Sequence, residues 1–294
     1  MGRARAALQG IQIAAEAAVS RISPQRLSMW EHPKCSYTAQ ESPAVSSPVE
    51  HPPDRTVSVV SLNLARENRA DKVVSAIQNS PRLRDADLFL FQEVRHARAG
   101  LNVAEEIARH FGYFSLFQPT ADNVYDQGLA LVSRHPVDDA EITRLKACDL
   151  RYRSRNRFAV AATMRTPWGA LRVWNAHLDT RINAEERLEQ LQPVISDASR
   201  HTGPRLIGGD FNTNELYWLR NVLPLPGGAS HGAAIRRAML HHGFETPLPN
   251  NVNTFPALRR HLDWIFVRDL KPMAASVERA PFSDHNAIWV RVGF

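Results

Sequence analysis

The sequence predicts an α/β fold with mixed β-sheets. Apolar runs of about four to eight residues, which are typical of buried strands, alternate along the chain with amphipathic, helix-like stretches. A tight turn joins at least one pair of these strands, so antiparallel neighbours are expected beside parallel ones. No repeat with a fixed period of about 20 to 50 residues is visible, which argues against a solenoid or a propeller.

The first elements of the domain are a strand and a helix, predicted at residues 57–64 and 69–79. The run Asp-Leu-Phe-Leu-Phe-Gln at 87–92 suits a strand that is buried on both faces, because it carries almost no polar residues. Three more elements are predicted before residue 135: a helix at 102–111 and strands at 113–118 and 128–133.

The next elements are a hairpin and a long helix. Strands at 158–165 and 170–178 flank the sequence Thr-Pro-Trp-Gly, which favours a hairpin turn. Residues 184–201 form the strongest predicted helix, since charged residues surround a stripe of leucine, valine and isoleucine. The remaining elements are a strand at 205–209, a loop at 224–232, a helix at 233–242, and strands at 262–267 and 286–292.

The first 55 residues differ in composition from the rest of the chain. An Ala-rich, weakly amphipathic stretch gives way to a segment rich in serine and proline at 35–53. Such a composition favours a weak helix followed by a disordered linker, because it offers little apolar surface to bury. We therefore expect one folded domain at residues 56–294.

Composition and charge limit the classes of protein. The chain has 294 residues, 44% of them hydrophobic, which is ample for a large core. Its formal charge of +6 favours encounter with phosphate-rich partners. No apolar run approaches the roughly 18 residues of a membrane span, and no clear signal-peptide core is present. Cys35 and Cys148 cannot form a disulfide framework or a zinc motif, which favours a reducing compartment. We expect a cytoplasmic protein that is a monomer.

Polar residues finish several of the apolar runs. Because strand ends meet at the edge of a sheet, these side chains should project into one shared cleft, a pattern that predicts a metal-dependent hydrolase. The residues are Asn63, Glu93, His177, Asp210, Asn212, Asp263, Asp284 and His285.

Strand periodicity places several polar residues on shared faces. Asn175, His177 and Asp179 alternate with apolar residues, so they should share one face and cannot all be core residues. The same rule places Asp210 and Asn212 together on one side. Two glycines precede Asp210 and permit a close approach of backbone or ligand.

Six short motifs, in this order along the chain, resemble those of the endonuclease/exonuclease/phosphatase superfamily. The resemblance covers residues 57–294 and implies a DNase I-like four-layer α/β sandwich, with two central mixed β-sheets flanked by helices and an active site at one end. The motifs are Ser-Leu-Asn at 61–63, Gln-Glu-Val at 92–94, His-Leu-Asp at 177–179, Gly-Asp-Phe-Asn at 209–212, Leu-Asp-Trp-Ile-Phe at 262–266 and Ser-Asp-His at 283–285.

The resemblance implies hydrolysis of phosphate esters with a divalent cation, usually Mg²⁺, for which Mn²⁺ can substitute. Mg²⁺ is a hard ion that prefers oxygen ligands and keeps several waters. Matched residue by residue, Glu93 is the first metal ligand that the resemblance implies. Asn63 and Asp284 would complete the protein contacts of the metal, directly or through water.

The same match implies roles for five further residues. Asp210 would orient or deprotonate the attacking water, and Asn212 and His177 would donate hydrogen bonds to the phosphate oxygens. His285 would be a second phosphate contact or a proton-transfer group, with Asp263 bound to its far ring nitrogen. Taken singly, each residue also has a structural interpretation, such as a turn aspartate, a core histidine or an ion pair of Asp263 with a nearby arginine.

A basic stretch precedes the predicted strand at 158–165. On an extended segment its arginines would share one face and could form a phosphate-binding rail, although a solvated edge strand explains them equally well. Arg157 resembles the family's phosphate-contacting arginine, and Arg155 could fill that place as well. The members of the stretch are Arg144, Lys146, Arg151, Arg153, Arg155 and Arg157.

The sequence thus predicts a Mg²⁺-dependent hydrolase of phosphodiester or phosphomonoester bonds whose substrate is a phosphate ester, with nucleic acid among the candidates. Specificity in such a fold lies in loops, here 120–127, 144–157 and 221–232. The alternative is a catalytically silent protein that binds a phosphate ligand or nucleic acid in the same cleft. A third hypothesis makes the basic, Ala-rich start of the chain an anchor to a membrane or a partner.

Overall fold

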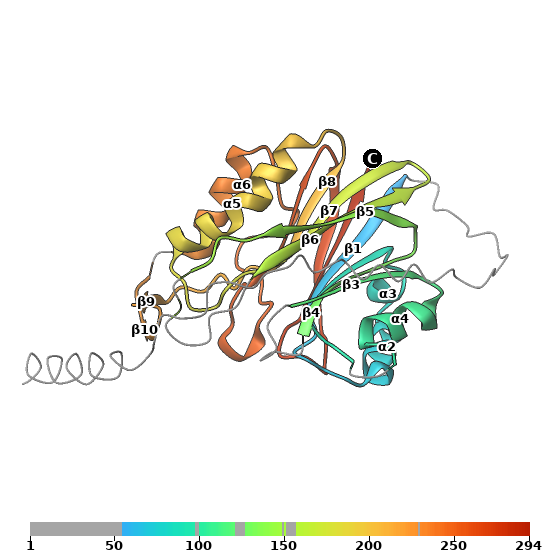
Figure 1. Ribbon diagram of the computed structural model, residues 1–294, viewed down its shortest axis with the longest axis horizontal. Coiled ribbons are helices and arrows are strands. Elements are labelled where there is room, and N and C mark those ends of the chain that lie inside the picture. Colours follow the sequence, from blue (N-terminus) through green and yellow to red (C-terminus); the bar gives the residue numbers. More distant parts are fainter. Residues whose placement is uncertain (1–54, 98–99, 121–126, 149, 151–156, 229) are drawn as a thin grey trace, which may run out of the picture. The chain divides into compact units, whose positions relative to one another are not determined.

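The computed structural model describes residues 55–294 except for 98–99, 121–126, 149, 151–156 and 229. The described residues belong to one compact unit, Cys35–Phe294. Two β-sheets pack face to face at its centre, and helices cover their outer faces (Figure 1). The expected four-layer arrangement is confirmed. The predictions for residues 1–54 and for Arg155 lie outside the described residues.

The larger sheet, sheet A, has six strands. β1 and β2 are parallel neighbours, and every other pair of neighbouring strands is antiparallel, so the sheet is mixed as predicted. In spatial order the strands are β12 (Lys271–Glu278), β13 (Ala287–Gly293), β1 (Thr56–Asn63), β2 (Leu88–Arg95), β4 (Gln127–Ser133) and β3 (Phe114–Pro119).

The second sheet, sheet B, has five strands and is also mixed, with β7 and β8 as its parallel pair. The predicted hairpin is confirmed as β6 and β7. In spatial order the strands are β11 (Asp263–Arg268), β8 (Arg205–Asp210), β7 (Gly169–His177), β6 (Phe158–Thr166) and β5 (Val137–Arg144). A separate small ribbon pairs β9 (Tyr217–Leu219) with β10 (Leu223–Leu225).

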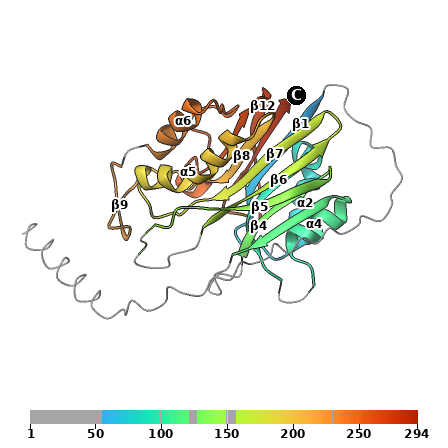
Figure 2. The ribbon, with the colours of Figure 1, turned by 45° about the horizontal axis from the view of Figure 1, so that its top comes forward.

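The helices divide between the two outer faces (Figure 2). α2 (Ala70–Asn79), α3 (Pro81–Arg84) and α4 (Val103–Phe111) accompany sheet A, whereas α5 (Ala184–Arg200) and α6 (His231–His241) cover sheet B. A short 3-10 turn, η1 (Pro256–Leu258), precedes β11.

Three hydrophobic clusters hold these layers together. Alternation along β2 shows how: Leu88 and Leu90 enter the cluster between the two sheets, whereas Phe89 and Phe91 enter the cluster beneath α2 and α4. The third cluster joins sheet B to α5 and α6 through residues such as Trp174. A strand that is buried on both faces consists almost entirely of apolar residues. This is why β2 could be predicted from the sequence.

Several elements were missed by the sequence prediction. The edge strands β5 and β12 carry many exposed polar or small residues, and α3, β9 and β10 are only three or four residues long. Such segments lack the periodic apolar signal on which the prediction depended. The loop expected at 224–232 contains the end of β10 and the start of α6, which begins two residues earlier than predicted.

A buried amide ties the two sheets together, and it corrects one prediction. The Asn175 side chain donates to the carbonyl oxygens of Phe91 and Ala130 and accepts a 2.8 Å bond from Gln92 Nε2. Alternation along the strand predicted that Asn175, His177 and Asp179 could not all lie in the core. All three are buried, because partners from elsewhere in the chain satisfy their polar atoms.

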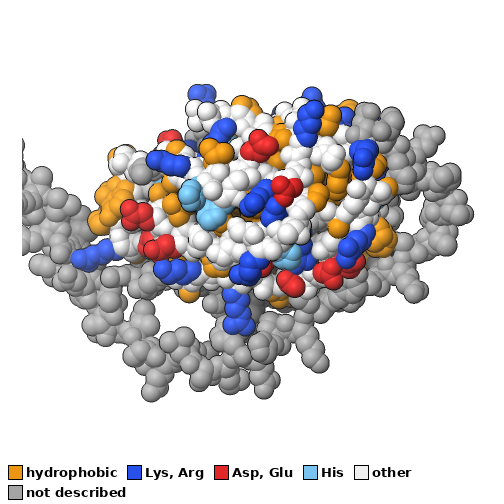
Figure 3. Space-filling model, turned by 90° about the horizontal axis from the view of Figure 1, so that it is seen from above, with side chains coloured by type: hydrophobic (Ala, Val, Ile, Leu, Met, Phe, Trp, Pro, Cys, Tyr) orange, Lys and Arg blue, Asp and Glu red, His pale blue; other side chains and the backbone are white. Residues whose placement is uncertain are grey.

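The charges on the surface are mixed. Basic, acidic and hydrophobic side chains are interspersed on the face shown in Figure 3. The net charge of +6 is therefore not gathered into one basic patch on that face. Among the described residues, no helix is both long enough and apolar enough to cross a membrane.

We predict that Asn175→Ala destabilises the fold by about 2 to 4 kcal/mol, since it leaves two buried carbonyl oxygens without the donor that they have now. Urea unfolding followed by circular dichroism measures the loss. Gln192→Ala is the control, because Gln192 is exposed and bonds only within its own helix. Equal stability of the two variants would contradict the role given to Asn175.

Candidate active site

The candidate site is built around Asp210, where the two sheets meet. Asp210 ends β8 and pairs in register with His177 at the end of β7 and with Asp263 at the start of β11. Gly209 makes this possible: its φ is +136°, and a Cβ atom there would lie 1.9 Å from the Ala176 carbonyl oxygen. The close approach that a glycine permits here is therefore that of the β7 backbone to Gly209.

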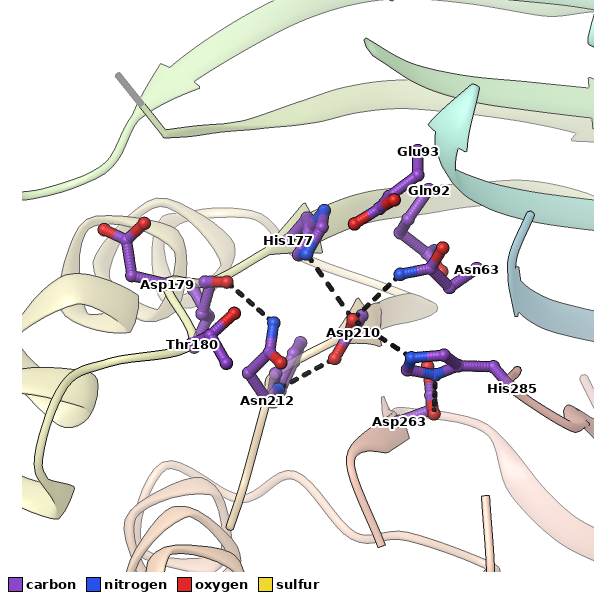
Figure 4. Close-up of polar contacts among 12 residues, drawn as sticks. Asn63, Gln92, Glu93, His177, Asp179, Thr180, Asp210, Asn212, Asp263 and His285 are labelled. Atoms are coloured by element: carbon purple, nitrogen blue, oxygen red, sulfur yellow. Dashed lines mark hydrogen bonds and ion pairs between the residues drawn. The ribbon is translucent and has the colours of Figure 1, made fainter. Parts of the chain in front are cut away.

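The Asp210 carboxylate is 1% exposed and is held by groups from both sheets (Figure 4). Asn63 Nδ2, from β1 of sheet A, donates to its Oδ2 atom at 3.0 Å. The backbone N–H of Asn212 donates to Oδ1 at 2.8 Å, and His177 Nε2 lies 3.4 Å from Oδ2. The carboxylate is thus fixed in position by donors on each side.

His285 links Asp210 to a second buried carboxylate. Its Nδ1 atom lies 2.9 Å from Asp263 Oδ2, and its Nε2 atom lies 3.9 Å from Asp210 Oδ2. The predicted contact of Asp263 with the far ring nitrogen of His285 is present. The alternative interpretation was an ion pair of Asp263 with Arg259 or Arg260. The described residues show no such pair, and Arg260 pairs with Glu215 instead.

Burial and charge shift the protonation of this chain of residues. Burial, reinforced by the nearby charge of Asp263, raises the pKa of Asp210 to about 7. Burial by itself disfavours the charged form of His285, but the charges of Asp263 and Asp210 outweigh it and raise the pKa of His285 to about 10. The arrangement therefore combines a charged imidazole with a carboxyl group that titrates near neutrality.

Glu93 reaches the same region from a bulge in β2. The strand does not end at residue 92 as predicted but runs to Arg95, because Val94 returns to pairing with Gly128 after the register shift. Glu93 has a left-handed φ of 52° within this bulge. Its carboxylate, 20% exposed, points into the space beside His177 and Asn63 (Figure 4) and lies 3.6 Å from Arg66 Nε.

The structure brings seven of the eight predicted strand-end residues into one region, and the eighth, Asp284, lies near enough to His285 for its charge to contribute to the raised pKa of that histidine. Asp284 is exposed, although the neighbouring His285 is buried. Asn212 lies beside Asp210, but its Nδ2 atom donates to the Leu178 carbonyl oxygen at 3.0 Å, which leaves one N–H of that amide for another partner. The metal-ligand role of Asp284 stays a prediction.

Arg157 is placed differently from the exposed rail that the sequence suggested. It is buried, and its Nε donates to Asp179 Oδ1 at 3.0 Å. Asp179 therefore pairs with Arg157 and not with the neighbouring Arg181. Arg157 lines a small cavity together with His177, so a contact between its guanidinium and a bound phosphate stays a prediction.

Sequence reasoning missed the residue that fixes the loops behind the site, Arg187 on α5. It is fully buried, and it donates to the carbonyl oxygens of Asp179, Thr180, Ile182 and Phe211. A further contact joins its Nε to Nδ1 of His231 at 3.3 Å. All five N–H groups of the guanidinium are therefore used, and the loops after β7 and β8 are tied to one helix.

Arg187 stays charged despite its burial. Burial lowers the pKa of Arg187 to about 10, and the charges of Asp210 and Asp179 oppose this shift. Its sequence signal was hidden, because an arginine in a charged, amphipathic helix is usually solvated. A charged residue on the otherwise apolar face of such a helix is the one sign that could have revealed it.

The donor atoms of the site suit a divalent cation. Asp210, Asp263 and His285 each bring one possible ligand atom within 4.8 Å of the others. However, the His285 nitrogen nearest to Asp263 already shares a hydrogen bond with that carboxylate. The partly exposed carboxylate of Glu93 offers oxygen ligands of the kind that Mg²⁺ prefers, whereas the side-chain oxygen of the nearby Asn63 already accepts a hydrogen bond from the backbone N–H of Ala65 at 2.9 Å.

A sandwich of two mixed sheets with buried carboxylates, amides and imidazoles at one end defines the class of protein. The model of the Endonuclease/Exonuclease/phosphatase family matches residues 60–285, and the chain belongs to this family. The resemblance noted from the motifs is thereby confirmed. The sequence matches no curated protein.

Several solved structures share this fold. An endonuclease/exonuclease/phosphatase from Beutenbergia cavernae is 18% identical, with 82% of this chain and 72% of that chain covered and a TM-score of 0.65. D. rerio TDP2 in complex with a single-strand DNA product is 16% identical, with coverages of 82% and 100% and a TM-score of 0.60. The human Nocturnin catalytic domain with bound sulfate is 18% identical, with coverages of 82% and 94% and a TM-score of 0.58. The DNase I-like fold is confirmed.

We predict that Arg187→Lys destabilises the protein by about 3 kcal/mol, because an ammonium group cannot replace five buried donors in a planar fork. Urea unfolding measures the loss. Arg200→Lys on the same helix is the control, since Arg200 is 72% exposed and should tolerate the change. A loss no larger than that of the control would show that the buried contacts of Arg187 contribute little.

Proposed function

We propose that the chain is a divalent-metal-dependent hydrolase of phosphate esters, with phosphodiesters as the preferred class. The observation that carries the proposal is the Asp210 carboxylate, buried and held by Asn63 and by the backbone of Asn212 beside two histidines. Such a carboxylate, fixed in orientation by its donors, suits a group that orients a water molecule and takes its proton. Membership of the family supports the same chemistry.

Glu93 would hold the metal ion, with Asn63 and the exposed Asp284 contributing directly or through water. When bound, Mg²⁺ or Mn²⁺ would polarise a phosphoryl oxygen and stabilise the leaving group. The left-handed φ of Glu93 supports this assignment, since backbone strain of this kind persists where the surrounding structure fixes it and is frequent at functional sites.

The phosphate itself would be held by groups around Asp210. His177 and His285 lie within 4 Å of the Asp210 carboxylate, so their N–H groups are placed for the oxygens of a phosphate in the same space. The free N–H of the Asn212 amide would add a third donor. Asp263 would keep the His285 ring oriented, because it binds the other ring nitrogen at 2.9 Å.

A nucleic-acid or nucleotide substrate has the strongest support among the phosphate esters. The chain carries a formal charge of +6, which favours approach of a polyanion. D. rerio TDP2, which has a related fold, was solved in complex with a single-strand DNA product.

We predict that Asp210→Asn lowers turnover by roughly a thousandfold, because the amide keeps the size of the carboxylate but cannot accept a proton. The measurement is product release from single- and double-stranded DNA, RNA, bis-p-nitrophenyl phosphate, an inositol phosphate and sphingomyelin, with Mg²⁺ and with EDTA.

Asp139→Asn is the matched control, since Asp139 lies exposed on the edge strand β5. Cleavage of one substrate class that EDTA and Asp210→Asn both abolish is the expected result. Unchanged turnover of Asp210→Asn would refute the role of Asp210. Binding of a substrate without any cleavage would favour a silent phosphate-binding protein.

We also predict that Glu93→Gln raises the Mg²⁺ concentration for half-maximal activity by about tenfold or more, because it removes the anionic ligand. Mn²⁺ binding measured by electron paramagnetic resonance gives a second readout that does not depend on turnover. Glu106→Gln on α4 serves as the control. If Glu93→Gln and the control require the same metal concentration, Glu93 is not a ligand.

A further inference from the structure

A buried amide on α5 holds the carboxylate that lies two residues after His177. Gln190 is fully buried, and its side chain binds Asp179 twice. Its Oε1 atom accepts a 2.8 Å hydrogen bond from the backbone N–H of Asp179, and its Nε2 atom donates to Asp179 Oδ2 at 2.8 Å. Two bonds to one residue fix the amide and the carboxylate relative to each other. Gln190 therefore determines how the Asp179 carboxylate is turned.

Asp179 in turn holds Arg157 by a single hydrogen bond. Arg157 Nε donates to Asp179 Oδ1 at 3.0 Å, and the two side chains are only 6% and 3% exposed. Within the described part of the chain, the terminal nitrogens of Arg157 make no hydrogen bond. The guanidinium thus uses its Nε–H group and keeps the N–H groups of both terminal nitrogens unpaired.

Gln190 explains why this contact is a single bond. Arginine and carboxylate groups frequently pair through two parallel hydrogen bonds, which would engage a terminal nitrogen of Arg157 as well. Here the Nε2 atom of Gln190 occupies Oδ2 of Asp179, so that only Oδ1 is turned toward Arg157. Without the amide, Oδ2 would be free to accept a second N–H group of the guanidinium.

The unpaired end of Arg157 belongs to the candidate active site. Arg157 and His177 line the same small cavity, whose volume of about 10 Å³ admits one water-sized group, such as a single phosphate oxygen. Since Nε is bound to Asp179, the terminal N–H groups are the donors that Arg157 can offer to this cavity. A buried cation with unpaired donors favours an anionic oxygen beside it, because burial without a partner is costly.

We propose that Gln190 is a positioning residue for Arg157. By holding Oδ2 of Asp179, it keeps the terminal N–H groups of Arg157 available for an oxygen of the substrate phosphate beside His177. Neither Gln190 nor Asp179 contacts the phosphate, and both act through Arg157. This inference rests on the proposed function, which places that phosphate between the histidines and Asp210, and it adds a determinant of how tightly the phosphate is bound.

The first test is a double-mutant cycle on turnover. Gln190→Met keeps the length of the side chain but removes its hydrogen bonds, whereas Arg157→Lys keeps the charge but has a single ammonium group, which Asp179 engages. We expect each single variant to raise KM for bis-p-nitrophenyl phosphate about tenfold, with kcat changed by less than about twofold. The double variant should have the KM of Arg157→Lys alone, because Gln190 acts only through that guanidinium.

Gln192→Met on the same helix is the matched control, since Gln192 is exposed and bonds only to Ser196. Its KM should equal that of the wild type. An unchanged KM in Gln190→Met, or effects that multiply to roughly a hundredfold in the double variant, would overturn the proposal. A purely structural role cannot produce the expected result, because loss of folded protein lowers the apparent kcat and leaves KM unchanged.

The second test needs neither turnover nor a folded variant of Gln190. Inorganic phosphate is titrated into the wild type in EDTA, and the side-chain N–H signals of Arg157 are followed by nuclear magnetic resonance. Their loss in Arg157→Lys assigns them. We expect the Nε–H signal to be protected from exchange throughout, and the terminal N–H signals to become protected only when phosphate binds.

Terminal N–H groups that are protected before phosphate is added, or that do not respond to phosphate, would overturn the proposal. A failure of the proposed function is recognised separately. Asp210→Asn would then leave turnover unchanged, while the signals of Arg157 would still report phosphate binding in EDTA.

Discussion

A single buried carboxylate joins the two halves of the fold at the site. Asp210 belongs to sheet B, yet its Oδ2 atom accepts a hydrogen bond from Asn63 of sheet A. An anion that is 1% exposed is tolerated only with such partners, because burial without them would cost several kcal/mol. The packing of one sheet on the other therefore sets the position of the Asp210 carboxylate, and the proposed chemistry depends on the sandwich being closed.

The site has supports both outside the six motifs, such as Arg187, and inside them, such as Asp179. Arg187 binds the loops that follow β7 and β8, and Asp179 holds Arg157 beside His177. Glu93 instead depends on a β-bulge that turns its side chain out of the regular pleat. The geometry of the candidate site thus depends on a buried guanidinium and a strained strand.

The sequence predicted the parts of the structure that carry a local signal. Apolar runs marked the buried strands, and the polar residues that end them, such as Asp210 and His177, do lie together. The rest depended on contacts between distant segments. Asn175 is buried because Gln92 and two carbonyl oxygens from the other sheet satisfy it. The edge strands β5 and β12 bury little apolar surface, so their sequences lack the alternation of apolar and polar residues that predicts a strand. They form strands because they pair with the neighbouring strands of their sheets.

Under the proposed function, Asp210 orients a water molecule for direct attack on the phosphorus atom of the substrate. The most direct test of that account is the stereochemical course at phosphorus, measured with a phosphorothioate diester of one configuration hydrolysed in ¹⁸O-labelled water. Direct attack of a water oriented by Asp210 predicts inversion, since a single in-line displacement inverts the phosphorus centre. Retention would require two displacements through a covalent enzyme intermediate and would contradict the account.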